Sequence, residues 1–195
     1  KKIIKLNLEN QNKKNFKSLN LKFSLVKAKV NGFFLDEIEL ENLYPDLKTL
    51  ESLYAYSLKN YRIGKITKAL ELVDKCIEMD NKNPYFHELK GQILFESGKS
   101  NESVSSFRKA IKLKPDEKSF NLFLAKSLYH SQRDSSFTES IDLLWKYIKN
   151  DDFPYEAWHY LGLNYGKIKK FDLSSYALAE KYLLVNEFKN AKIHI

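Results

Sequence analysis

The sequence has few of the residues that interrupt helices and almost none that cross-link a fold. Its 195 residues include six Gly, four Pro and one Cys. So little Gly and Pro favours long helices joined by short turns over a loop-rich β protein. The single cysteine, Cys76, excludes an internal disulfide and any zinc site built from several cysteines. No apolar run approaches the roughly 20 residues of a membrane-spanning helix, so we expect no membrane span.

The excess positive charge is confined to the start of the chain. Residues 1–30 hold nine Lys and one acidic residue, Glu9, which accounts for the whole formal net charge of +8. The rest of the chain holds 24 basic and 24 acidic side chains. A Lys- and Asn-rich leader of this kind is typical of a solvated connector. We therefore expect no nucleic-acid partner. If the leader did bind nucleic acid, that binding would weaken strongly with salt.

Both ends of the sequence resemble positions in the interior of a longer chain. Residue 1 is Lys, and no secretory signal pattern follows it. At the other end, residues 187–193 are predicted to begin a helix just before the chain stops at Ile195. We expect the sequence to be a piece of a longer protein.

A repeat of about 34 residues dominates the rest of the chain. One unit opens at Asn83–Pro84, where Asn is a favoured N-cap and Pro fits the first helical position. Small and apolar residues recur in register in the neighbouring units. They are Gly64, Ala69 and Cys76; Gly98, Ser103 and Ala110; Ala125, Ser140 and Tyr147; and Trp158, Leu161, Gly162 and Tyr165. This spacing predicts an all-α solenoid of about four helical hairpins.

The pattern divides the chain into four segments. They are a basic polar leader at 1–17, connecting helices at 18–49, the repeat array at 50–185 and the start of a final helix at 186–195. The connecting segment is expected to contain a short helix at residues 36–44, stopped by Pro45, preceded by an amphipathic helix in which apolar residues recur at spacings of three and four. Those residues are Leu19, Phe23, Val26, Val30 and Phe33. The third repeat is some three residues too long, and the excess lies between its helices at 132–136.

The repeat units resemble the tetratricopeptide repeat. The pattern of that repeat is a large residue, then Leu-Gly and Tyr, followed by a small residue, an aromatic, Ala and Pro. The match covers roughly residues 50–185. The resemblance implies a right-handed superhelix of helical hairpins, with extra helices packed at its N-terminal end.

A narrower resemblance rests on three stretches of sequence. Residues 83–92, 26–33 and 157–166, the last with Ala177–Glu180 behind it, are similar to the repeat region of BepA-like bacterial zinc metalloproteases. That resemblance implies an HExxH protease domain ahead of this segment, zinc in that domain, and a periplasmic or cell-envelope location. A cytoplasmic location is the alternative.

The sequence itself offers no catalytic or metal-binding constellation. His87-Glu88 begins like HExxH, but Gly91 stands where the second histidine would have to ligate zinc. The other histidines, His130, His159 and His194, lack acidic or cysteine partners at ligand spacing. Cys76 lies on the inward stripe of its helix, which favours a buried packing role. We expect this segment to have no catalytic residue, no metal and no cofactor of its own, although the parent implied by the resemblance would be a zinc metalloendopeptidase.

The remaining candidate site is a groove lined by the first helix of each hairpin. Tyr61, Phe95 and Tyr129 recur at equivalent positions and are expected to form an aromatic ladder between polar groups. The expected groove residues are Tyr54, Leu58, Tyr61, Glu88, Gln92, Phe95, Leu122, Lys126, Tyr129 and His159. Amphipathic anchors of this kind suit an extended peptide or a partner helix. The same face could instead cover the parent's own protease domain.

Two functional hypotheses follow. In the first, the array binds substrate or partner proteins for an attached envelope zinc metalloprotease, or covers its active site. In the alternative, it is a free-standing tetratricopeptide-repeat scaffold with no enzyme attached. The reading frame ahead of Lys1 separates the two.

Overall fold

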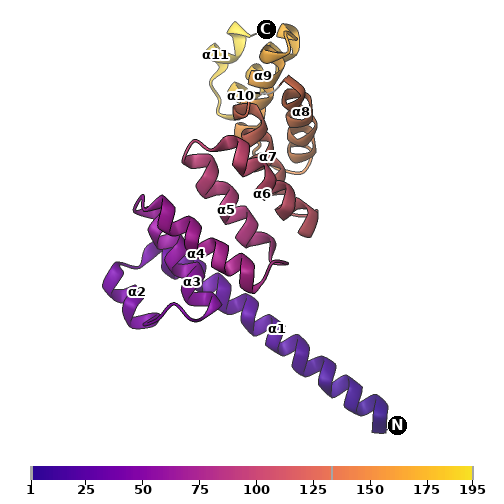
Figure 1. Cartoon of the computed structure of the whole chain (residues 1–195). Coiled ribbons are helices and arrows are strands. Elements are labelled where there is room, and N and C mark those ends of the chain that lie inside the picture. Colours follow the sequence, from indigo (N-terminus) through magenta and orange to yellow (C-terminus); the bar gives the residue numbers. More distant parts are fainter. Residues whose placement is uncertain (1, 133, 195) are drawn as a thin grey trace. The chain divides into compact units, whose positions relative to one another are not determined.

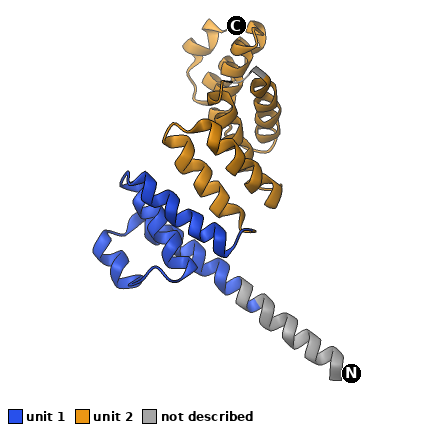
Figure 2. Ribbon diagram, in the orientation of Figure 1, with its two compact units in different colours: residues 1–81 blue, residues 82–195 orange. Residues whose placement is uncertain are grey.

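The chain folds into α-helices joined by short turns, as the computed structural model shows (Figure 1). The structure describes the backbone of residues 2–132 and 134–194, and the side chains of 16, 19–132 and 135–194. Within these residues there are eleven helices and no strand, which confirms the predicted all-α class. The helices form two compact units, residues 1–81 and 82–195 (Figure 2).

The first unit contains four helices. They are α1 (Lys2–Phe34), α2 (Glu37–Leu43), α3 (Leu50–Arg62) and α4 (Ile66–Met79). Helix α3 pairs with α4 as a hairpin, and α1 packs against α3. Helix α1 runs without interruption across the expected boundary at residue 17.

Helix α1 packs through its smallest residues rather than through its large apolar stripe. Ala28 is fully buried, and a Cβ on Gly32 would lie 2.2 Å from the carbonyl oxygen of Ala55 on α3. Only a residue without a side chain permits this approach of two backbones. The predicted stripe that includes Phe23 and Val26 is therefore turned away from α3 and exposed.

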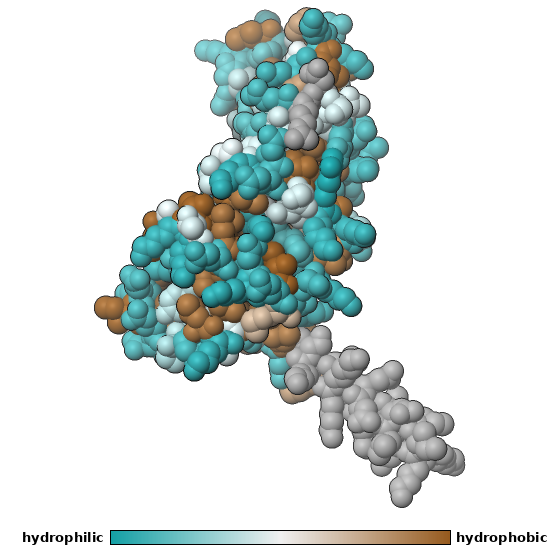
Figure 3. Space-filling model, viewed as in Figure 1, coloured by the Kyte–Doolittle hydropathy of each residue, from teal (hydrophilic) through white to brown (hydrophobic). Residues whose placement is uncertain are grey.

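The second unit contains three more hairpins and a short final helix. Its helices are α5 (Pro84–Glu96), α6 (Ser100–Leu113), α7 (Lys118–His130), α8 (Asp134–Ile148), α9 (Tyr155–Lys167), α10 (Phe171–Leu184) and α11 (Phe188–Ile193). The pairs are α5 with α6, α7 with α8 and α9 with α10, and α11 packs on α10. Side chains from successive hairpins share one core, in which Leu128, Leu144 and Leu161 are buried. Hydrophobic residues also reach the surface in patches between hydrophilic ones (Figure 3).

Small residues let the two helices of each hairpin cross closely. A Cβ on Gly91 would lie 2.8 Å from the Phe107 ring, and one on Gly162 would lie 2.8 Å from Leu178. At the equivalent crossing of the third hairpin, the Ser140 hydroxyl donates a hydrogen bond to the Ala125 carbonyl (2.9 Å). These contacts agree with the register that the repeat predicts.

The turns inside the hairpins share a left-handed backbone position. Gly64 and Gly98 have φ of 75° and 81°, as expected for glycine at a turn. The corresponding residues of the later hairpins are Gln132 (φ 53°) and Lys169 (φ 61°), which keep this conformation with a side chain present. The left-handed turn conformation is thus kept in the two later hairpins, although they have no glycine at this position.

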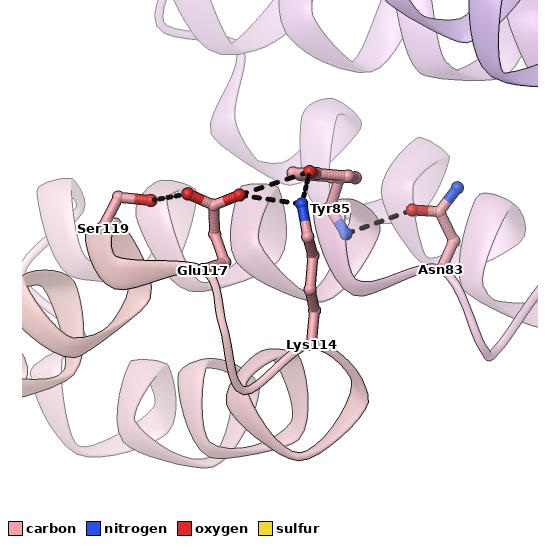
Figure 4. Close-up of polar contacts among 5 residues, drawn as sticks. All are labelled: Asn83, Tyr85, Lys114, Glu117 and Ser119. Carbon is pink, nitrogen blue, oxygen red and sulfur yellow. Dashed lines mark hydrogen bonds and ion pairs between the residues drawn. The ribbon is translucent and has the colours of Figure 1, made fainter.

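A polar cluster fastens the α6–α7 turn to the start of α5 (Figure 4). The Asn83 side chain caps α5 by accepting from the backbone N–H of Tyr85 (3.1 Å). The Lys114 ammonium donates to the Tyr85 hydroxyl and to Glu117 Oε2, the latter at 2.9 Å. Ser119 donates to the other oxygen of Glu117 (3.1 Å). These bonds raise the pKa of Lys114, first through Tyr85, and lower the pKa of Glu117, first through Lys114.

Candidate functional site

The first helices of the three hairpins in the second unit lie next to one another. Helix α7 contacts α5 on one side and α9 on the other. Each of these helices turns its small crossing residue, such as Gly91 or Gly162, toward the second helix of its own hairpin. Side chains elsewhere on α5, α7 and α9 can then meet their counterparts on the neighbouring first helix. We call this surface the α5–α7–α9 face; it comprises Phe95, Phe123, Lys126, Tyr129, His130, Glu156, His159 and Tyr160.

Lys126 is the centre of this face. Its Nζ lies 2.6 Å from Glu156 Oε1 on the next hairpin. The same nitrogen lies 5.6 Å from the centroid of the Phe95 ring, 5.9 Å from that of Phe123 and 5.7 Å from that of Tyr160. An ammonium within about 6 Å of an aromatic ring is attracted by the ring's quadrupole. The Lys126 side chain is only 14% exposed, so the pair and the rings hold it in a defined position.

Aromatic rings surround this lysine in a continuous set of contacts. The His130 ring centroid lies 5.4 Å from that of Phe95 and 5.1 Å from that of Tyr129. Tyr129 in turn lies 5.7 Å from Tyr160, whose hydroxyl is 3.2 Å from His130 Nε2. Tyr160 also contacts His159 (5.6 Å). Rings from α5, α7 and α9 thereby form one partly exposed aromatic surface.

The local environment keeps the two histidines uncharged near neutral pH. Burial and then the Lys126 charge lower the pKa of His130. Burial and then the Lys181 charge lower the pKa of His159, although Glu156 opposes the shift. Neutral imidazoles offer one donor and one acceptor nitrogen each. His159 Nδ1 is buried and has no hydrogen-bond partner among the described residues.

Four of the expected groove residues come together on this face. Phe95, Lys126, Tyr129 and His159 take part in the contacts above. Gln92 lies partly buried on α5, without a role in these contacts.

Two other expected groove residues of the second unit are buried. Leu122 belongs to the shared core of the hairpins, and Glu88, one repeat earlier, is also buried. The expectation that they lie on an exposed stripe is wrong, because Leu122 packs in that core and Glu88, at the equivalent position of the preceding repeat, is buried as well.

The three expected residues of the first unit are divided in the same way. Tyr54 and Leu58 are buried, which corrects their assignment to an exposed stripe. Helix α3 is covered by α1 as well as by α4, so less of its surface is free than that of an uncovered first helix. Tyr61 is partly exposed, like Phe95 and Tyr129.

Four residues of the face were not among the expected ones. Phe123 and Tyr160 are equivalent positions of consecutive repeats once the three-residue excess of the third unit is counted. That register could have identified both. His130 has no acidic or cysteine partner at ligand spacing, so the sequence around it predicts no role for it. Glu156 gave no sequence signal, because its partner Lys126 is 30 residues away on another helix.

Cys76 and His87, the residues considered above for nucleophile or zinc chemistry, are buried in the described structure. No group of three or more His, Cys, Asp or Glu residues in the described part of the chain is arranged to hold a metal ion. Cys76 is fully buried, and burial raises the pKa of its thiol to about 12, so it is a protonated packing residue at neutral pH. His87 is buried on α5, and Gly91 one turn later faces Phe107. The described helices also lack the combination of length and hydrophobicity that crossing a bilayer requires.

Comparison with known sequences identifies one repeat. Residues 85–117, which span α5 from its second residue and the whole of α6, match the sequence model of the tetratricopeptide repeat. No curated protein sequence matches the chain.

Comparison with solved structures extends the similarity over most of the chain. A structure of MamA AMB-1 has a TM-score of 0.72 at 13% identity, covering 85% of this chain and 99% of that one. MamA from Desulfovibrio magneticus RS-1 has a TM-score of 0.62 at 16% identity, covering 74% and 90%. YrrB, described as a TPR protein with an unusual peptide-binding site, has a TM-score of 0.69 at 12% identity, covering 90% and 94%. At such identities the likeness concerns the fold alone. The chain thus carries a tetratricopeptide repeat at residues 85–117 within an all-α fold of the tetratricopeptide-repeat type.

Proposed function

We propose that this protein is a scaffold that binds segments of other proteins on the α5–α7–α9 face. The observation that carries the proposal is the held position of Lys126, enclosed by Phe95, Phe123 and Tyr160 and paired with Glu156. Aromatic rings held at partial exposure supply contact area at a small entropic cost. The paired charges and neutral histidines supply hydrogen-bonding groups for a peptide backbone or polar side chain. YrrB, a protein of similar fold, is described as having a peptide-binding site, which supports the same class of ligand.

The proposal is tested by selecting ligands from a random peptide library displayed on phage, with the full chain as bait. Selected peptides are then titrated against the native chain and a variant carrying Phe95→Ala and Tyr129→Ala. We expect the double variant to lose more than about tenfold in affinity, since aromatic anchors dominate such interfaces. Phe153→Ala is the matched control, because Phe153 is an exposed aromatic outside the face. Equal affinity for all three proteins would contradict the proposal.

The free-standing scaffold is the reading that the comparisons favour over an attached protease. The sequence resemblance to BepA-like zinc metalloproteases remains a separate proposal about the surroundings of this array. It would place an HExxH domain with its zinc ahead of Lys1, with the protein in the cell envelope and the array serving that domain. Sequencing the reading frame ahead of Lys1 tests it: a start codon just before Lys1 with no HExxH leaves only the free-standing scaffold.

A further inference from the structure

Helix α1 carries a row of large apolar side chains that remain exposed in the described structure. We call this row the α1 seam. It consists of Phe16, Leu19, Phe23, Val26, Val30 and Phe33, which are between 41% and 71% exposed. A solvent-facing row of this length calls for a partner, because single exposed apolar residues are common but contiguous ones mark interaction sites.

The seam has the spacing of a coiled coil. Its residues alternate at intervals of three and four, so that Phe16, Phe23 and Val30 fill one heptad position and Leu19, Val26 and Phe33 another. A hydrophobic period of 3.5 residues keeps a strip two positions wide facing a second helix. An apolar strip confined to two heptad positions is the narrow seam typical of a coiled coil. The spacing therefore favours a helical partner.

The opposite side of α1 packs against α3, so the seam faces away from α3. Leu25, Ala28 and Gly32 pack toward α3, and the Ser24 hydroxyl donates to Glu51 Oε1 on α3 (2.7 Å). Rotating α1 to bury the seam would replace the close Gly32 contact with bulky side chains. The packing of α1 on α3 thus leaves the seam exposed.

The charged side chains described beside the seam are basic. The sequence has no acidic residue between Glu9 and Asp36. Lys22 and Lys27 are exposed at the two positions that flank a heptad seam, and the Arg62 guanidinium lies over the Phe33 ring at 4.6 Å. Two copies of this helix would bring lysines against lysines in a parallel pair, which is unfavourable. An acidic helix would instead form complementary pairs along both edges.

We propose that the α1 seam docks an acidic amphipathic helix of a partner protein, with its apolar residues at heptad spacing and Glu or Asp beside them. This surface is distinct from the α5–α7–α9 face, and its binding does not depend on the function proposed for that face.

The test uses a synthetic peptide about four heptads long with Ile and Leu at the seam positions and Glu at the flanking ones. Its like charges oppose self-association. Fluorescence anisotropy with the full chain should show binding that weakens with salt, and a matched peptide with Lys at the flanking positions should not bind. Val26→Asp should weaken binding more than about tenfold. Ile38→Asp on α2 is the control, since Ile38 is as exposed as Phe23 at 71%. Lys22→Glu with Lys27→Glu should reverse the preference between the two peptides.

Circular dichroism verifies that each variant is folded; the substituted side chains are exposed, so their replacement leaves the core intact. Equal binding of the acidic peptide to the native chain and to Val26→Asp would overturn the proposal. A second outcome would also overturn it: sedimentation showing that the chain alone is a dimer and that Val26→Asp dissociates this dimer. The seam would then be occupied by a second copy of the chain. The chain could instead bind phosphatidylglycerol vesicles, lose this binding in Val26→Asp, and fail to bind the acidic peptide. That result would overturn the proposal, because the partner of the seam would be a membrane surface and not a helix.

Discussion

Lys126 and Glu156 form an ion pair between consecutive hairpins, with 2.6 Å between Nζ and Oε1. The two partners differ in exposure: the lysine side chain is largely covered by rings, whereas half of the glutamate side chain is open to solvent. An ion pair with one open partner adds little stability, and packing of the lysine stem adds more.

The first prediction separates these two contributions. Glu156→Gln should lower the free energy of unfolding by less than about 1 kcal/mol, because the pair is partly screened. Lys126→Ala should lower it further, because the stem and its contacts with Phe95, Phe123 and Tyr160 are lost as well. Urea denaturation of both variants measures the difference. Equal losses would mean that the rings do not hold the lysine.

The second prediction concerns two glycines one turn apart on α9. A Cβ on Gly162 would lie 2.8 Å from Leu178, whereas one on Gly166 would meet Ser174 at an ordinary 3.6 Å. Gly166→Ala should raise the free energy of unfolding by about 0.5–1 kcal/mol through helix propensity. Gly162→Ala should lower it, because overpacking costs about 1–3 kcal/mol. Thermal denaturation with the same direction of change for both would show that the helices do not cross at Gly162.

The hairpins can be predicted from the sequence because nearby residues within each repeat determine its helix starts, turns and crossings. Asn83 and Pro84 mark a helix start, Gly64 and Gly98 mark turns, and Gly91 marks a crossing. These features depend on backbone sterics within one hairpin. By contrast, which side of α1 packs on α3 depends on a contact between Gly32 and Ala55, far apart in the sequence. The apolar stripe alone suggests the opposite side.

The candidate site could be predicted only in part for a related reason. Aromatic residues that recur at the repeat period of about 34 residues, such as Phe95 and Tyr129, can be predicted from spacing. Exposure cannot be predicted from the same spacing, since Tyr54, Leu58, Glu88 and Leu122 belong to the expected stripe but are buried. Glu156 is brought to Lys126 by hairpin stacking, which no local pattern encodes.

The third prediction uses the left-handed turn position. Lys169 holds φ at 61°, where Gly98 of an earlier hairpin holds 81°. Lys169→Gly should raise the free energy of unfolding by up to about 1 kcal/mol, because a side chain in this conformation costs about 1–2 kcal/mol and glycine's unfolded-state entropy offsets part of the gain. Lys109→Gly, at an exposed position within α6, should lower it by about 1 kcal/mol. If chemical denaturation shows both variants destabilised alike, the turn is not strained at Lys169.

The fourth prediction is the pH dependence of the polar cluster at the α6–α7 turn. The pKa of Glu117 is lowered, so its stabilising effect is present above the unfolded-state pKa of about 4.3 and is lost as the pH falls through the lower folded-state pKa. Glu117→Gln should therefore cost less than about 1 kcal/mol at neutral pH, discounted for partial exposure, and nothing in strong acid. Urea denaturation of the native chain and the variant across acidic pH measures this difference. Ser105→Ala on the exposed side of α6 is the control and should show no such pH dependence. A deficit for Glu117→Gln that persists below the folded-state pKa would exclude the Lys114 ion pair as its cause.

The measurement that tests the binding account most directly is a map of where a library-selected peptide contacts the protein. Amide chemical shifts of the isotope-labelled chain would be recorded with and without saturating peptide. The account predicts that the largest changes fall on α5, α7 and α9 around Phe95, Lys126, Tyr129 and Tyr160, and that they disappear in the Phe95→Ala, Tyr129→Ala variant. Largest changes on α6, α8 or α10, unaffected by that variant, would contradict it.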